Sequence, residues 1–235
     1  MIQAFYSGTA GLSAHQNSLD VISNNVANVN TNGYKTKKQD FGSLLYASEV
    51  RPETRNSDNL IAGAGASLNS VKTDMSHGNI DITEGNTDFY IEGDGFFAVR
   101  DNAGNTYYTK DGGFQAVNTG NGMILGTQDG LAVLDRYGNT IPVTEEGPQA
   151  MPGVYAFTNA PGLLSAGQNL FIANNVSGPA VATDELPRQG IVERSNVNLA
   201  NEMVNLIVSQ RGYQLNANVV TTADQIEQMI NDLNA

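Results

Sequence analysis

The sequence predicts an α+β protein, in which an N-terminal and a C-terminal helix pair as a coiled-coil-like stem around a central all-β module. Two observations predict this class. Apolar residues recur with helical spacing at both ends of the 235-residue chain, and short apolar runs alternate with turn dipeptides between them. We expect four segments: a helical segment at 1–35, an extended excursion or hairpin at 36–78, a β-rich module at 79–190 and a second helical segment at 191–235.

The first helix is predicted by a seven-residue apolar repeat made by Phe5, Leu12, Leu19 and Val26, with Ile22 and Val29 at the complementary positions. We place it at about residues 3–29. The repeat is followed by five asparagines between Asn24 and Asn32. An amide does not titrate near neutral pH, so it cannot act as a general acid or base. We interpret Asn28, Asn30 and the Asn32-Gly33 pair as a helix stop followed by a fixed turn.

Segment 42–75 differs in composition from the parts of the chain on either side. It is rich in Ser, Asn, Gly and Ala and contains one proline. Such a composition is typical of an extended excursion or hairpin outside a packed core.

The β-rich module is predicted from residues 88–114 and 123–143, where apolar runs alternate with turn signals. The turn signals are Asp94-Gly95, Asp111-Gly112, Asp129-Gly130 and Gly138-Asn139. They separate apolar runs of four to six residues, which is the usual length of a strand.

The second helix is predicted at about residues 199–233, with Asn198 as its N-cap, Glu202 in its first turn and Gly212 as its weak point. It carries two apolar stripes. One is Leu215, Val219, Thr222, Ile226, Met229 and Leu233, and the other is Leu199, Met203, Leu206, Gln210, Tyr213, Ala217 and Val220. One antiparallel partner covers a single stripe, so the remaining apolar surface indicates contact with another molecule.

The composition argues against several classes of function. A net charge of −12 disfavours nucleic-acid binding, and the absence of cysteine excludes disulfides and thiolate chemistry. The N-terminus lacks a basic region before an apolar run, so we expect no cleaved signal peptide, and no stretch is apolar enough to span a membrane.

We also predict no catalytic, cofactor or metal site and no small-molecule substrate. His15 lies on the apolar repeat and His77 beside a glycine, in no zinc-binding pattern. The acidic pairs Glu145-Glu146 and Asp184-Glu185 lie in Gly- and Pro-flanked stretches typical of solvated loops.

Several motifs, in the same order along the chain, resemble those of the bacterial flagellar axial proteins, the rod, hook and hook-associated subunits. The N-terminal motif spans Asn24 to Lys35, NNVANVNTNGYK, and the C-terminal ones are Ser195-Asn196-Val197-Asn198-Leu199, Glu202-Met203 and Gln210-Arg211-Gly212-Tyr213-Gln214. The middle contributes Asp88-Phe89-Tyr90-Ile91, Gly93 to Phe97 and Tyr108 to Gly112. Within this family the chain is most similar to the distal rod subunit, and a proximal rod or hook-type subunit stays open as an alternative.

The resemblance implies a structural subunit of the basal-body rod, exported by the flagellar type III system and located in the cell envelope. Its terminal helices would order on assembly into a helical tube of identical copies, with other rod and hook subunits as neighbours. The family-signature residues would be Asn24, Asn25, Ala27, Asn28, Thr31, Gly33, Tyr34, Lys35, Ser195, Asn196 and Val197. The self-assembly surface would comprise Leu12, Leu19, Ile22, Val26, Leu199, Met203, Leu206, Tyr213, Leu215, Val219, Ile226 and Met229.

Two functions of other classes compete with this one. A cell-surface glycan-binding or adhesin module accounts for the acidic β-rich middle but leaves the terminal repeats unexplained. A secreted hydrolase requires a cluster of polar residues that the sequence does not display.

Overall fold

The computed structural model describes residues 2–44, 46–48, 61–63, 65–120, 122–144 and 147–233. The chain forms two compact units. Unit 1 comprises Met1–Val26, Lys37–Lys72 and Asn198–Ala235, and unit 2 comprises Ala27–Thr36 and Thr73–Val197. The predicted segments follow one another along the chain, whereas each unit brings together segments that are distant in sequence. The structure confirms the two predicted terminal helices and the β-rich centre, which together give the α+β class.

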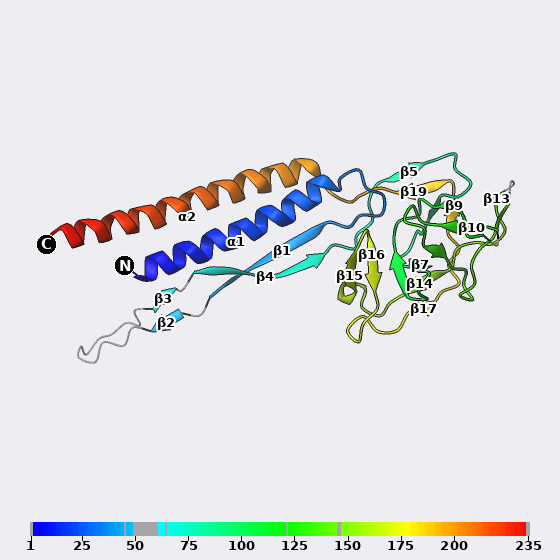
Figure 1. Ribbon diagram of the computed structural model, residues 1–235, viewed down its shortest axis with the longest axis horizontal. Coiled ribbons are helices and arrows are strands. Elements are labelled where there is room, and N and C mark those ends of the chain that lie inside the picture. The colour runs from blue at the N-terminus through cyan, green and yellow to red at the C-terminus, as the bar shows by residue number, and fades with distance from the viewer. Residues whose placement is uncertain are drawn as a thin grey trace. The chain divides into compact units, whose positions relative to one another are not determined.

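Unit 1 contains helices α1 (Ile2–Ala27) and α2 (Leu199–Leu233), which lie side by side (Figure 1). Strand β1 (Lys37–Ser43) pairs with β4 (Ala66–Thr73), and β2 (Tyr46–Ser48) pairs with β3 (Ile61–Gly63). The β1–β4 ribbon runs along α1, where Gly65 approaches Ser7 and Ala10. The described part of segment 42–75 is therefore a set of paired strands, while residues 45, 49–60 and 64 lie outside the described ranges.

The two helices of unit 1 pack through small and polar residues. The buried face of α1 comprises Gly8, Gly11, Ala14, Ser18, Ile22 and Asn25. Ser18 and Ser209 share a buried hydrogen bond of 2.9 Å between their hydroxyls. Asn216 lies over Gly11 and Val220 over Gly8, so the contacts on α2 move toward its C-terminus as those on α1 move toward the N-terminus. The helices are therefore antiparallel.

This packing corrects the predicted contact face of the first helix. Phe5 is 45% exposed, and Leu12, Leu19 and Val26 are only half-buried. Small residues at the centre of the contact let two helix backbones approach closely, and a centre of larger apolar residues would hold them apart. The seven-residue repeat thus flanks the helix contact and does not form its centre.

Helix α2 spans Leu199–Leu233, as predicted, and Asn198 caps it. The Asn198 side-chain oxygen accepts a hydrogen bond from the Asn201 N–H at 3.2 Å, as an N-cap residue does. Helix α1 ends at Ala27, two residues earlier than expected, because the Thr31 N–H bonds to the Asn28 carbonyl and closes a turn there.

Unit 2 is built around a nine-stranded sheet. Its main path runs β15 (Leu164–Gly167), β16 (Leu170–Ile172), β8 (Thr106–Thr109), β7 (Phe96–Arg100), β11 (Ala132–Val133), β10 (Met123–Gly126) and β9 (Gln115–Asn118). Off this path, β14 (Val154–Ala156) pairs with β7 and with β17 (Val181–Ala182). The strand pairings among the described residues of this sheet are antiparallel.

Three two-stranded pairs and one short helix complete unit 2. The pairs are β5 (Ile80–Ile82) with β19 (Ile191–Glu193), β6 (Phe89–Tyr90) with β18 (Arg188–Gln189), and β12 (Val143–Thr144) with β13 (Gly147–Pro148). The 3₁₀ helix η1 spans Ala160–Gly162.

The core of unit 2 consists mainly of side chains from the sheet and from β6, together with Ile91, Phe114 and Ile141 from the connecting segments. Its fully buried members include Phe89, Phe97, Val99, Leu125 and Val133. Two of the predicted turns are present, at Asp129-Gly130 and Gly138-Asn139. Gly130 and Gly138 adopt φ of 83° and 81°, and their N–H groups donate to the backbone carbonyls of Thr127 and Asp135. Across the ranges listed above, no helix is long and apolar enough to cross a bilayer.

We predict that Gly212→Ala destabilises unit 1 although alanine favours a helix. A Cβ at position 212 would collide with the imidazole of His15, which outweighs the gain in helix propensity of about 1 kcal/mol. We expect a net loss of about 1–3 kcal/mol, measured from helical circular dichroism during thermal unfolding. Combining Gly212→Ala with His15→Ala should recover most of the loss, and Asn205→Ala on the exposed face of α2 is the control. Equal losses in the single and double variants would contradict the packing.

Candidate functional site

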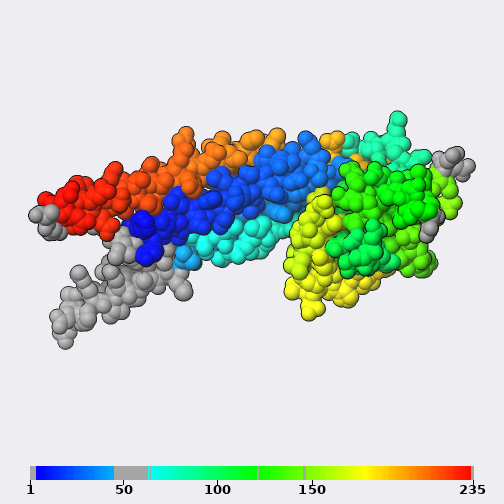
Figure 2. All heavy atoms as spheres, viewed as in Figure 1, coloured from blue at the N-terminus to red at the C-terminus, as the bar shows by residue number. Residues whose placement is uncertain are grey.

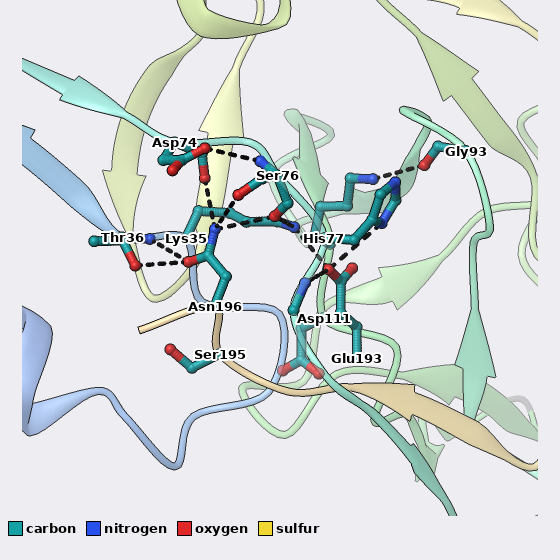
Figure 3. Close-up of polar contacts among 12 residues, drawn as sticks. Lys35, Thr36, Asp74, Ser76, His77, Gly93, Asp111, Glu193, Ser195 and Asn196 are labelled. Atoms are coloured by element: carbon teal, nitrogen blue, oxygen red, sulfur yellow. Dashed lines mark hydrogen bonds and ion pairs between the residues drawn. The ribbon is translucent and has the colours of Figure 1, made fainter. Parts of the chain in front are cut away.

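The candidate site is a group of polar residues in unit 2, which we call the junction cluster: Lys35, Thr36, Asp74, Ser76, Glu193 and Asn196 (Figure 3). Lys35, Thr36 and Glu193 are buried, Asp74 and Asn196 are half-buried, and Ser76 is exposed. At its centre the Lys35 Nζ lies 2.8 Å from the Glu193 Oε1, and the two side chains are 1% and 3% exposed. A buried ion pair is tolerated only when its remaining hydrogen-bonding capacity is satisfied. Here the Lys35 Nζ also donates to the Ser76 carbonyl at 2.8 Å, and the same Glu193 oxygen accepts the Gly78 N–H at 2.7 Å.

Asn196 connects three backbone segments through one amide. Its Oδ1 accepts both the N–H and the hydroxyl of Thr36, each at 2.7 Å. Its Nδ2 donates to the carbonyls of Asp74 and Ser76, each at 3.0 Å. Its backbone N–H bonds to the Tyr34 carbonyl at 3.4 Å. The amide therefore acts as a structural connector of unit 2.

Gly33 lies in the turn that directs the N-terminal segment of unit 2 into this cluster. Its φ is 65°, a conformation that favours glycine, and a Cβ there would lie 2.5 Å from the Asp111 nitrogen. Its N–H donates to the Glu193 carbonyl at 2.8 Å. Both the turn and the close backbone approach therefore require glycine.

Asn25 has a comparable connecting role inside unit 1. Its side chain is buried, and it accepts the Lys37 N–H and donates to the Lys37 carbonyl, both at 2.9 Å. The amide thus pairs with the first residue of β1 as a neighbouring strand would. The stop after α1 is made at Asn28, whose side-chain oxygen accepts the Thr31 hydroxyl at 3.2 Å.

The other predicted signature residues divide by exposure. Tyr34 and Ser195 are buried, and the Ser195 hydroxyl accepts the Val197 N–H at 3.3 Å. Asn24 and Ala27 are exposed, and Val197 is half-buried. Sequence reasoning missed Glu193, Ser76 and Asp74, because a single carboxylate in a strand and two residues in an irregular stretch carry no local pattern.

Two ionisable side chains, buried Lys110 and half-buried Asp111, follow one another at the end of β8. Burial lowers the pKa of Lys110 to about 8, with the positive charge of Lys35 as a second cause. Its ammonium group donates to the Gly93 carbonyl at 2.8 Å and lies 5.4 Å from the centroid of the Phe96 ring. Burial raises the pKa of Asp111 to about 6, against the opposing hydrogen bond from the Gly113 N–H.

The predicted self-assembly residues occupy different environments in unit 1. Leu199, Met203, Tyr213, Leu215, Val219, Ile226 and Met229 are exposed, each by 39% or more. Leu12, Leu19, Val26 and Leu206 are half-buried. Ile22 is 1% exposed and packs inside unit 1, so it is not available as a surface residue. Figure 2 shows α2 as a continuous exposed row of side chains along this unit.

The described residues contain no group of three or more His, Asp or Glu side chains placed to hold a metal ion. The junction cluster instead uses its polar atoms to join backbone segments. Its geometry therefore gives the cluster a structural role, in which two motifs far apart in sequence meet around the buried Lys35–Glu193 pair.

Comparisons with known proteins identify the family. Residues 5–35 match the family described as flagella basal body rod protein, and residues 188–233 match the C-terminal region described for the flagellar basal body rod proteins FlgEFG. The flagellar basal-body rod protein FlgG of Buchnera aphidicola subsp. Baizongia pistaciae is 36% identical over 98% of this chain and 99% of its own length. The chain belongs to the flagellar basal-body rod protein family.

Two relatives from Bacillus subtilis show how broad the similarity is. Its flagellar basal-body rod protein FlgG is 32% identical, over 99% of both chains. Its flagellar hook-basal body complex protein FlhP is 30% identical, over 99% of this chain and all of its own length. The two matched family regions contain both halves of the central ion pair, Lys35 and Glu193.

We predict that Lys35→Met destabilises unit 2 by about 3–5 kcal/mol, because it leaves the Glu193 carboxylate buried without its partner. Glu193→Gln combined with Lys35→Met should cost less than the sum of the two single changes. Urea unfolding followed by tyrosine fluorescence measures both. Lys72→Met is the control, because the Lys72–Asp40 pair is 71% and 58% exposed and contributes little. Strict additivity would argue against the buried pair.

We predict that Asp111→Asn raises the free energy of unfolding at pH 7 by as much as about 3 kcal/mol. Because the folded pKa is raised above 3.8, the folded state binds more protons than the unfolded state between pH 3.8 and about 6, and stability falls as the pH rises through that window. The free energy of unfolding of the variant should not fall between pH 3.8 and about 6, and at pH 3 it should equal that of the parent protein. Unfolding titrations across pH 3–7, with exposed Asp20→Asn as the control, test it. An unchanged pH profile would show that Asp111 is not the group responsible.

Proposed function

We propose that this chain is a structural subunit of the bacterial flagellar basal-body rod, most like the distal rod subunit, and that it assembles with identical copies into a helical tube. The observation that carries the proposal is the surface of α2. Of its residues only Glu202 and Ser209 are buried, while twelve apolar side chains are exposed. These are Leu199, Met203, Val204, Ile207, Val208, Tyr213, Leu215, Val219, Ile226, Met229, Ile230 and Leu233.

Seven of the exposed apolar residues of α2 are ordered along one side of the helix. Val204, Val208, Leu215, Val219, Ile226, Met229 and Leu233 follow one another at spacings of three, four or seven residues. This is the spacing of a coiled-coil seam. The stripe lies on a different face from Ser209 and Asn216, which contact α1. The helix thus pairs with α1 through its more polar face and leaves its more apolar face uncovered.

A contiguous apolar face of this size favours burial against a partner. When the partner is another copy and the contact is head-to-tail, the assembly continues as an open helix. Family membership supports this type of assembly over a closed oligomer. The surface we propose for it comprises the twelve α2 residues together with half-buried Leu12, Leu19, Val26 and Leu206, and it omits Ile22.

The remaining roles follow from the family and from the two units. Other rod and hook subunits are the proposed neighbours, the flagellar type III system exports the chain, and the basal body is its location. The terminal helices of unit 1 would pair further with those of neighbouring copies in coiled-coil fashion, and unit 2 would make the outer contacts. We propose that the chain is not an enzyme and binds neither nucleic acid nor a cofactor.

A second candidate within the same family is a proximal rod or hook-type axial subunit. The similarity to FlhP of Bacillus subtilis, at 30% identity over nearly the whole chain, favours keeping it. The relatives named FlgG favour the distal rod. Locating the chain along purified basal bodies separates the two candidates.

We predict that Ile226→Asp abolishes assembly and leaves the thermal stability of the free subunit unchanged. Ile226 is 44% exposed, so a carboxylate there is solvated in the monomer and is buried only when a neighbour covers α2. Negative-stain microscopy and sedimentation of concentrated protein measure assembly. Asn231→Asp places the same charge at another exposed position of α2 and is the control. Filaments formed by Ile226→Asp as readily as by the parent would refute the proposed surface.

A further inference from the structure

Residues 188–197 of unit 2, which we call the latch segment, supply partners to four earlier parts of that unit. Strand β18 pairs Arg188 with Tyr90 and Gln189 with Phe89. Strand β19 pairs its residues 191–193 with β5, residues 80–82. In addition to these strand pairings, Glu193 and Asn196 bind residues 33–36 and 74–78. One short segment therefore completes pairings that begin in four places.

The earlier segments are left incomplete when the latch segment is absent. Lys35 would lose its counterion and keep its hydrogen bond to the Ser76 carbonyl. The Gly33 N–H and the Thr36 N–H would lose their acceptors, Glu193 O and Asn196 Oδ1. Buried charges and buried N–H groups without partners carry large free-energy penalties. The N-terminal segment of unit 2 is thus held in place by the last segment of the same unit.

The rest of unit 2 is held together by pairings of shorter range. Strands β7 and β8 form an antiparallel pair joined by residues 101–105, and β9 and β10 are joined by residues 119–122. The Lys35–Glu193 contact, in contrast, joins residues 158 positions apart. The entropic penalty of closing a loop grows with its length, so short-range pairs form before long-range ones.

We propose that the latch segment closes last in folding, and that unit 2 reaches its native state only after residues 188–197 have packed against residues 33–36. A chain is synthesised from its N-terminus, so an unfinished chain lacks the latch and keeps unit 2 open. The next consequence rests on the proposed function. A subunit that must pass unfolded through an export channel stays incompletely folded for longer when the last segment of its β-rich unit is the one that completes the native state.

Stopped-flow folding and unfolding of the full-length chain in urea tests the proposal. A contact that forms after the transition state changes the unfolding rate and leaves the folding rate almost unchanged. We expect Asn196→Ala and Glu193→Gln to raise the unfolding rate by about tenfold or more and to leave the folding rate within about twofold. Val99→Ala, in the buried centre of β7, is the matched control and should slow folding severalfold.

A folding rate that falls as much for Asn196→Ala as for Val99→Ala would overturn the proposal, and so would unchanged rates in both latch variants. Where Asn196→Ala does not fold, Thr36→Val removes only the hydroxyl donor at 2.7 Å from Asn196 and keeps the measurement possible. These rates are measured on dilute monomer. If the folding rates contradict the proposal for the latch segment, the assembly experiment with Ile226→Asp still tests the proposed function. If that assembly experiment contradicts the proposed function, the folding rates still test the proposal for the latch segment.

Discussion

The buried ion pair between Lys35 and Glu193 is the interaction on which unit 2 depends. Two opposite charges, 1% and 3% exposed, are further stabilised there by a hydrogen bond from Lys35 to the Ser76 carbonyl and one from the Gly78 N–H to Glu193. Those partners fix the path of the backbone at residues 33–36 and 74–78. Asn196 fixes the same two stretches a second time through its amide. The start and the end of unit 2 are therefore joined by an ion pair and hydrogen bonds, whereas the apolar core is formed mainly by side chains of the sheet.

The contact between the two helices of unit 1 is different in kind, because small and polar residues form it. The helices meet through Gly8, Gly11, Ser18, Ser209 and Gly212, which bury little apolar area. Hydrophobic stabilisation scales with the apolar area removed from water, so this contact specifies the pairing more than it stabilises it. The larger apolar residues of α2 stay exposed. In a monomer these exposed apolar side chains contribute no hydrophobic stabilisation. Such a distribution is expected in a subunit whose helices are covered by neighbouring copies after assembly.

The helices and the strand-rich centre were predictable because they depend on spacing along the chain. The limits of α2 followed from its apolar stripes and from Asn198, whose cap is present. The face that each helix buries was not predictable in the same way. Glycine and serine carry no apolar signal, so the contact between His15 and Gly212 explains a glycine that spacing alone marked only as a weak point.

The junction cluster was half predictable. Asn28, Asn30 and the Asn32-Gly33 pair were interpreted as a helix stop and a turn, and the bonds at Asn28 and the φ of Gly33 bear this out for those two residues. Asn25 and Lys35 belong to the same motif, but their partners lie at Lys37 and Glu193, and the second of these is 158 positions away. A single sequence gives no information on such a pairing, because the preference of a buried lysine for a carboxylate does not say which carboxylate.

The most direct test of the central claim, that neighbouring copies cover α2, is methionine oxidation footprinting of the free and the assembled subunit. Met203 and Met229 lie on α2 and are 45% and 58% exposed in the free chain. The account predicts that both oxidise readily in the monomer and are protected about tenfold or more after assembly. Equal oxidation rates of these two methionines in the free and the assembled protein would contradict it.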